Sequence, residues 1–242
     1  MSFYRFMQFL WISTLVGLLL TAKANAEEAW SLYKKADGIS MHQRHVVVSG
    51  QKMLEIKVQL EYQGRIGAFL HLLADTEHAA SWLHNVAQVR LIRKRAANED
   101  LVYSRFNAPW PLADRELVSC SDWAQDDSFM LNFEVGDCGD LVPENPGQLR
   151  LRNFTASWQL FLRPDGKVQL LYIGTADAGG AVPRFFSDPI TLSSSWKSFN
   201  GLKRQIEKPE YQKPYAGICN IVYHPHSTSD NFTNDMPCAR VD

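Results

Sequence analysis

Alternating apolar and polar side chains predict a β-strand at residues 54–61. The apolar positions are Leu54, Ile56, Val58 and Leu60, and a polar residue follows each of them. Because successive side chains of a strand point to opposite faces, we expect one face of this strand to be buried and the other to be exposed to solvent. We expect a second strand at residues 39–48, joined to the first by a turn at Ser49-Gly50, and before it a short helix that carries Trp30 and Tyr33.

The hydrophobic period then changes to that of a helix. Residues Ile66, Phe69, Leu70 and Leu73 follow the spacing i, i+3, i+4, i+7, which predicts a helix over residues 65–74. Extended patterning returns from Val86 to about Ala178, and Asp165-Gly166 is a hairpin signal within it. The expected strands are 86–95, 99–107, 114–125, 128–136, 149–163 and 167–178. One face of the fourth is expected to carry Phe129, Leu131, Phe133 and Val135.

A long helix is expected to begin at Pro183, just after Gly179-Gly180. Its apolar residues recur at spacings of three and four: Leu192, Trp196, Phe199, Leu202 and Ile206. This order of elements predicts an α+β fold in which a curved antiparallel sheet wraps around the C-terminal helix. The space that such an arrangement encloses suits a ligand.

The first residues have the pattern of a cleavable export signal. Arg5 precedes an apolar run from Phe6 to Leu20, and Ala24-Asn25-Ala26 supplies the small residues that a signal peptidase needs. The run is short for a membrane span, which takes about 20 apolar residues. We therefore expect a signal peptide at 1–26, a periplasmic or secreted location, one ligand-binding domain at 27–207, and an irregular tail at 208–242.

All four cysteines follow the signal, and an even number in an exported chain permits disulfides. Cys219 and Cys238 bracket the loop-rich tail, and we expect them to pair. Two interpretations stay open for Cys120 and Cys138, a disulfide or two buried thiols. A tight turn near Asp126-Asp127 would place Cys120 opposite a residue near Phe133, which argues against their pairing.

Charge and motifs exclude several classes of function. The formal net charge is −1 and Lys and Arg are spread along the chain, so no nucleic-acid partner is expected. The HExxH, GxSxG, Walker and GxGxxG motifs are absent from the sequence, and we expect no cofactor and no metal. His71 and His78, seven residues apart, are more typical of a helix surface than of metal ligands. A monomer is expected.

Residues 109–118, PWPLADRELV, resemble a signature of START domains, the lipid-transfer modules of the helix-grip superfamily. That signature is a proline, a few residues, Arg-Asp or Arg-Glu, an apolar residue and valine. Trp82 before the Val86 strand, Trp158 in a long strand, and residues 178–186 before the last helix match further features in the same order. The resemblance covers about residues 30–207 and implies a cavity that holds a lipid, a sterol or another apolar molecule. Ser121 stands six residues beyond Arg115, where sterol-binding members tend to carry an arginine, which disfavours a sterol.

The resemblance implies a binder or carrier of an apolar ligand, with transient membrane contact as a candidate interaction. The expected ligand contacts are Trp82, Arg105, Trp110, Leu131, Phe133, Trp158, Tyr172, Phe185, Trp196 and Phe199. Two alternatives remain. One is a cyclase or aromatase that would use ionisable residues on the inner face, for which the sequence offers Arg105, Asp122 and Glu134. The other is a filled interaction domain without a ligand.

Overall fold

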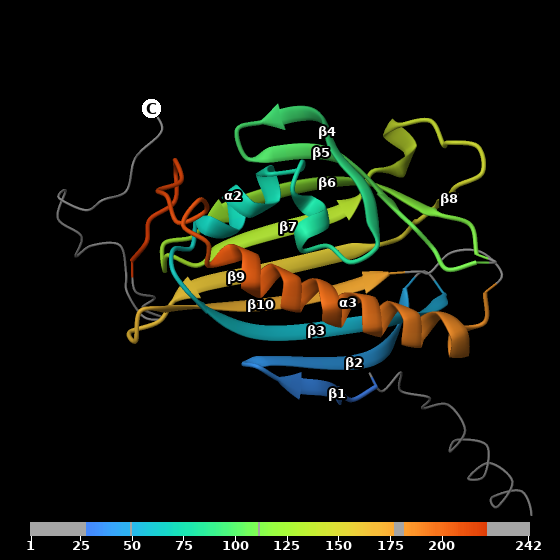
Figure 1. Cartoon of the computed structure of the whole chain (residues 1–242), viewed down its shortest axis with the longest axis horizontal. Coiled ribbons are helices and arrows are strands. Elements are labelled where there is room, and N and C mark those ends of the chain that lie inside the picture. Colours follow the sequence, from blue (N-terminus) through green and yellow to red (C-terminus); the bar gives the residue numbers. More distant parts are fainter. Residues whose placement is uncertain (1–27, 49, 111, 177–181, 222–242) are drawn as a thin grey trace, which may run out of the picture.

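The computed structural model describes residues 28–48, 50–110, 112–176 and 182–221. Its strands are β1 (Ser31–Ala36), β2 (Ile39–Val48), β3 (Gln51–Gln63), β4 (Val86–Ala96), β5 (Glu99–Phe106), β6 (Arg115–Gln125), β7 (Leu131–Asp137), β8 (Leu149–Arg150), β9 (Thr155–Leu162) and β10 (Lys167–Ala176). They form one sheet in the order β1-β2-β3-β10-β9-β7-β6-β5-β4 (Figure 1). Every pairing is antiparallel except that of β6 with the short β8, which is parallel.

The prediction of a short helix around Trp30 and Tyr33 is wrong, because Tyr33 lies in β1. Asp37 and Gly38 have φ angles of 52° and 73° and connect Ala36 directly to Ile39 in an antiparallel pair. A two-residue turn with positive φ matches the twist of a hairpin, and Asp-Gly is the usual sequence for it. The same dipeptide at Asp165-Gly166 lies in the turn between β9 and β10, as its hairpin signal predicts.

The connection between β6 and β7 is longer than expected and decides the pairing of two cysteines. The Asp126 carboxylate accepts hydrogen bonds from the backbone N–H groups of Ser128 and Met130, and Phe129 has a φ angle of 66°. The strand therefore starts at Leu131 and does not include Phe129. Gln125 pairs with Leu131, which places Cys120 opposite Gly136 and not near Phe133.

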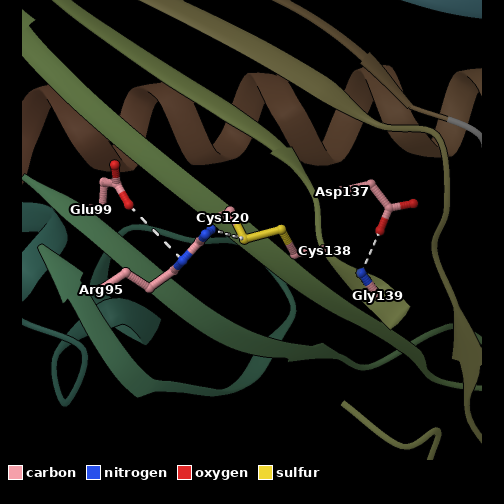
Figure 2. The surroundings of a disulfide bond; sticks show 6 residues. All are labelled: Arg95, Glu99, Cys120, Asp137, Cys138 and Gly139. Atoms are coloured by element: carbon pink, nitrogen blue, oxygen red, sulfur yellow. Dashed lines mark hydrogen bonds and ion pairs between the residues drawn. A yellow bond between two sulfur atoms is a disulfide. The ribbon is translucent and has the colours of Figure 1, made fainter. Parts of the chain in front are cut away.

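Cys120 and Cys138 form a disulfide, with their Cα atoms 5.6 Å apart (Figure 2). Of the two interpretations left open for Cys120 and Cys138, the disulfide is therefore correct and the pair of buried thiols is wrong. The argument from a tight turn failed because the Asp126 loop shifts the register between β6 and β7. Cys238 lies outside the described residues, so its pairing with Cys219 stays a prediction.

The strand expected at residues 149–163 is broken into β8 and β9. Asn153 has a φ angle of 55°, and its backbone N–H donates to the Asp137 carboxylate across 2.8 Å. The break lets β8 leave β9 and pair with the start of β6, where the backbone N–H of Leu149 donates to the carbonyl of Asp114. The chain on either side of this break borders the site described below.

The helices α2 (Ala68–Ala74) and α3 (Arg184–Ile206) and the 3-10 turn η1 (Ala79–Ser81) cover one face of the sheet (Figure 1). The core between them and the strands includes Phe69, Leu160 and Leu202. A smaller cluster of Leu101, Tyr103 and Val118 lies apart from it, near the 3-10 turn η2 (Gly139–Leu141). No helix within the described residues is long and apolar enough to cross a membrane.

The start of the expected tail packs against the domain. Tyr211 and Ile218 are buried in the main core. The Tyr211 hydroxyl donates to the Asp75 carboxylate across 2.8 Å, and the backbone N–H of Ile66 donates to the Asn220 side chain across 2.8 Å. These contacts join the chain beyond α3 to the segment around α2. Residues 222–242 lie outside the described part of the chain.

Candidate functional site

A cavity of about 440 Å³ lies between α3 and the inner face of the sheet. Strand alternation explains which residues reach it. Along β6, the side chains of Arg115, Leu117 and Ser119 line the cavity, whereas Glu116 and Val118 between them are buried on the opposite face. Most of the lining is apolar, and it includes Leu83, Phe106, Leu117, Val135, Leu151, Phe154, Trp158, Ile190 and Phe199.

The deep end of the cavity is closed by aromatic rings. Trp158 on β9 lies 4.5 Å from Tyr172 on β10 and 5.6 Å from Phe199 on α3, measured between ring centroids. Phe69 of α2 lies behind them, 5.1 Å from Trp158. Burial raises the pKa of the Tyr172 hydroxyl to about 12, so this wall stays uncharged. The α3 residues that line the cavity run from Ser187 to Leu202, and the last two of them, Phe199 and Leu202, also belong to the main core.

Hydroxyl groups supply most of the polar lining. Five come from one side of α3: Ser187, Thr191, Ser194, Ser195 and Ser198. The Thr191 and Ser198 hydroxyls donate to backbone carbonyls one turn earlier, each across 3.0 Å. Ser104 and Ser119 on the sheet are buried and line the same space, and neither hydroxyl has a hydrogen bond to any described residue. The wall thus offers neutral hydrogen-bonding groups next to apolar surface.

The loop after η1 holds α3 close to the sheet. The backbone N–H of His84 donates to the Ser198 hydroxyl across 3.0 Å. Gly201 packs so closely on Trp82 that an added Cβ would lie 2.5 Å from the Trp82 carbonyl oxygen. Trp82 lines the cavity, and its indole N–H is buried without a hydrogen-bond partner in the described chain. This contact fixes one side of the cavity roof.

The cavity continues to the surface at one side. A second space of about 480 Å³ shares Asn107, Pro109 and Ile190 with the first and extends to the exposed residues Pro189 and Lys197. It lies between the loop after β5 and the N-terminal half of α3, and we refer to it as the mouth. A ligand that enters here passes between these two elements.

The charged residues of the cavity and mouth are basic. Arg115 lines the cavity, and His84 and Lys197 line the mouth, whereas no Asp or Glu stands among the described lining residues. Burial lowers the pKa of the Arg115 guanidinium, which donates one hydrogen bond to the Ala113 carbonyl. Burial, together with the nearby Lys197 charge, lowers the pKa of His84. The site therefore has a positive character at neutral pH, carried by Arg115 and Lys197.

The structure brings four of the ten expected contact residues together. Trp82, Trp158, Tyr172 and Phe199 all line the cavity. Leu131 and Phe133 lie instead in the packed core beyond it, where Phe133 meets Phe69 edge to face. Trp196 is turned toward the edge of the sheet, with the Lys34 ammonium 4.8 Å from its ring centroid.

Three other expected contact residues lie outside the cavity. Arg105 pairs with Asp114 across 3.7 Å at a half-exposed position. The Trp110 and Phe185 side chains are 92% and 70% exposed. Asp122 and Glu134, which the enzyme alternative required on the inner face, are exposed and pair across β6 and β7 on the outer face. None of the ionisable residues offered for that alternative lines the cavity.

Sequence reasoning missed Arg115 and the hydroxyl groups of α3 as lining residues. Alternation along β6 places Arg115, Leu117 and Ser119 on one face of the strand, and this is the signal that identifies Arg115 as a lining residue. On α3, hydroxyl residues recur with the same spacing as the aromatic residues, at Ser187, Thr191, Ser194 and Ser198. That spacing of three and four residues marks a continuous polar side of the helix.

Comparisons with known proteins agree with this architecture. No family model matches the chain. An uncharacterized protein of Pseudomonas aeruginosa is 22% identical over 183 residues, which are 75% of this chain and 88% of that protein. A STAR-related lipid transfer protein from Xanthomonas axonopodis matches with a TM-score of 0.66 and 22% identity, over 74% of this chain and 99% of the solved fragment. Human StAR-related lipid transfer protein 5 matches with a TM-score of 0.62 and 16% identity, over 84% of this chain and 96% of that one.

These likenesses establish the fold. The chain has the START-like helix-grip fold, a large antiparallel sheet with a long C-terminal helix lying across it. The α+β fold class expected from the sequence is confirmed.

Proposed function

We propose that this protein binds an apolar or amphiphilic small molecule, such as a lipid, in the cavity beneath α3 and carries it. The observation that supports the proposal most directly is the cavity itself, about 440 Å³ of space that is lined mainly by apolar side chains and adjoins the main hydrophobic core. Buried apolar ligand surface contributes roughly 25 cal/mol per Å², so such a wall holds a water-insoluble molecule with few polar contacts. Solved proteins with this fold carry lipid transfer in their names.

Mass spectrometry under native conditions tests this proposal. The protein purified from its own compartment is expected to carry an apolar molecule that organic extraction removes. Leu117→Trp places a large ring in the cavity and is expected to prevent reloading, because Leu117 lines the space from β6. Leu91→Trp on the exposed face of β4 is the matched control and should reload normally. A wild-type protein that takes up no apolar molecule, with its fold intact, would overturn the proposal.

We further propose that the protein works after export, with residues 1–26 removed. The Cys120–Cys138 disulfide supports this location, because structural disulfides persist in oxidising compartments. The mature protein is expected to begin at Glu27, which N-terminal sequencing can check. Recovery of a membrane-bound form that retains Met1 would contradict the proposal.

Transient contact with a lipid surface fits the exposed apolar side chains near the mouth. Trp110 follows Pro109 of the mouth, while Phe185 and Phe186 precede Ile190, and all four of these large side chains are exposed. Tryptophan favours the boundary between lipid and water. Trp110→Ser is expected to lower co-sedimentation with phosphatidylcholine vesicles, whereas Leu91→Ser, a similar loss of exposed apolar surface on β4, is not.

A further inference from the structure

Arg115 is a partly buried cation, and no carboxylate of the described residues lies within ion-pair distance of it. It is the first residue of β6, lines the cavity, and forms no ion pair with any described residue. Two carboxylates flank Arg115 in the sequence. Asp114 lies 3.7 Å from Arg105 and accepts the backbone N–H of Ala108. Glu116 is buried on the opposite face of β6, where it pairs with Arg150. A guanidinium presents five N–H donors, and one carbonyl bond to Ala113 leaves most of them unused.

The surroundings of Arg115 favour an anion over a neutral group. No acidic side chain stands among the described lining residues, and Lys197 adds a second positive charge at the mouth. Val182 and Ser187 at the start of α3 border the same space, and the first turn of this helix carries no acidic residue. The N-terminus of a helix is the positive end of its dipole, so the start of α3 adds a positive partial charge to the cavity wall.

The polarity of the lining differs between the part of the cavity around Arg115 and the part around Trp158. Arg115 pairs with Phe106 across β5 and β6, so its part of the lining belongs to the loop between these two strands. At the far end, Trp158, Tyr172 and Phe199 form an uncharged aromatic wall. A molecule that fills such a space buries an apolar chain against the aromatic wall and keeps a charged group near the loop.

We infer that the cavity takes an amphiphile that places an anionic end group, a carboxylate or a phosphate, against Arg115. The inference rests on the proposed function and adds the chemical class of the ligand to it. Arginine suits this task because its planar fork donates two parallel hydrogen bonds to a carboxylate or phosphate. Even partial burial of a cation that has no ion-pair partner is unfavourable, and the ligand would supply that partner.

A displacement experiment tests the inference on the full mature chain. The neutral fluorophore diphenylhexatriene reports occupancy of the cavity, and dodecanoate, dodecyl phosphate and methyl dodecanoate compete with it at pH 7.5. Both anionic chains are expected to displace the fluorophore at lower concentrations than the ester does. Arg115→Gln should weaken the two anions about 10- to 100-fold, the range of a hydrogen bond to a charged group, and leave the ester unchanged. Arg115→Lys should retain part of the preference.

Controls separate the sources of failure. Arg93→Gln removes an exposed arginine of β4 and should leave all three affinities unchanged. Inorganic phosphate should not displace the fluorophore, because it lacks the apolar chain. Displacement by phosphate alone would overturn the inference that the ligand is an amphiphile. Equal displacement by acid and ester in the wild-type protein would overturn the role of Arg115 and leave the proposed function standing. A wild-type protein that binds neither the fluorophore nor any chain would overturn both.

Discussion

The Arg150 guanidinium donates to the Glu116 carboxylate with Nη2 2.7 Å from Oε1, and both side chains are almost fully buried. Glu116 belongs to β6 and faces away from the cavity, whereas Arg150 ends β8. The Tyr103 hydroxyl and the Asn145 side chain also donate to Glu116. Arg150 in turn donates to the carbonyls of Gly139, Val142 and Pro143. The pair therefore ties residues 139–150 to the outer face of β6.

Removing one partner of this pair is expected to destabilise the fold strongly. Arg150→Met leaves the Glu116 carboxylate buried without its cation, a change that typically costs about 3–5 kcal/mol of unfolding free energy. Urea denaturation at pH 7 measures it. Arg152→Met removes the half-exposed arginine that pairs with Asp140 and Glu144 and should cost about 1 kcal/mol or less. Equal midpoints for the two variants would contradict this account.

The same pair predicts a loss of stability in acid. Burial raises the pKa of the Glu116 carboxyl, but hydrogen bonds from Asn145 and Arg150 lower it more, and the net pKa lies below the ordinary 4.5. A carboxyl with a lowered folded-state pKa contributes stability above its ordinary pKa and loses it as the pH falls through the folded-state value. Denaturation curves from pH 7 down to pH 3 should therefore show a fall in wild-type stability below pH 4.5. Glu116→Gln should show a smaller fall over that range.

The disulfide between Cys120 and Cys138 is expected to contribute to stability through the unfolded state. It closes a loop with a sequence separation of 18, for which chain entropy predicts about 3 kcal/mol. The double variant Cys120→Ala/Cys138→Ala should unfold at a lower urea concentration than the oxidised wild type. The cavity lies across the sheet from this bridge, so diphenylhexatriene binding below the transition should be unchanged. A bridge-free variant with wild-type stability would show that the bridge is dispensable.

Gly201 is expected to be intolerant of a side chain. An added Cβ would lie 2.5 Å from the Trp82 carbonyl oxygen, so that α3 must move away from the loop that holds it. Overpacking of this kind typically costs about 1–3 kcal/mol. Gly136→Ala on β7 is the matched control, because a Cβ there meets no heavy atom within 4 Å. If Gly201→Ala is as stable as the control, α3 is not fixed at this point.

The sequence predicted the fold well where a period or a turn signal was present. The alternation around Leu54–Leu60, the helix over residues 65–74 and the helix after Pro183 all correspond to β3, α2 and α3. The errors came from local backbone chemistry. The Asp37-Gly38 turn, the Asp126 loop and the positive φ of Asn153 each depend on one or two residues, and no hydrophobic period reveals them.

The candidate site was harder to predict than the fold. Aromatic side chains at inward positions either fill a core or line a cavity, and only the packing of α3 on the sheet separates the two. Phe133 and Trp158 lie on neighbouring strands as cross-strand partners, yet Phe133 belongs to the core and Trp158 lines the cavity. The boundary between core and cavity depends on Phe69 of α2, which contacts both rings.

Phe199 and Trp196 on α3 provide the sharpest test of that boundary. Phe199 lines the cavity and contacts Trp158 and Tyr172, whereas Trp196 lies outside the lining near Lys34. Phe199→Ala is expected to weaken diphenylhexatriene binding and to lower the unfolding free energy by up to about 3–5 kcal/mol. Trp196→Ala should also lower stability, through lost packing and a cation–π contact of about 0.5–1 kcal/mol, but leave the affinity unchanged. Weaker binding in Trp196→Ala with unchanged binding in Phe199→Ala would reverse the assignment of the two residues and move the ligand toward the β1 edge of the sheet.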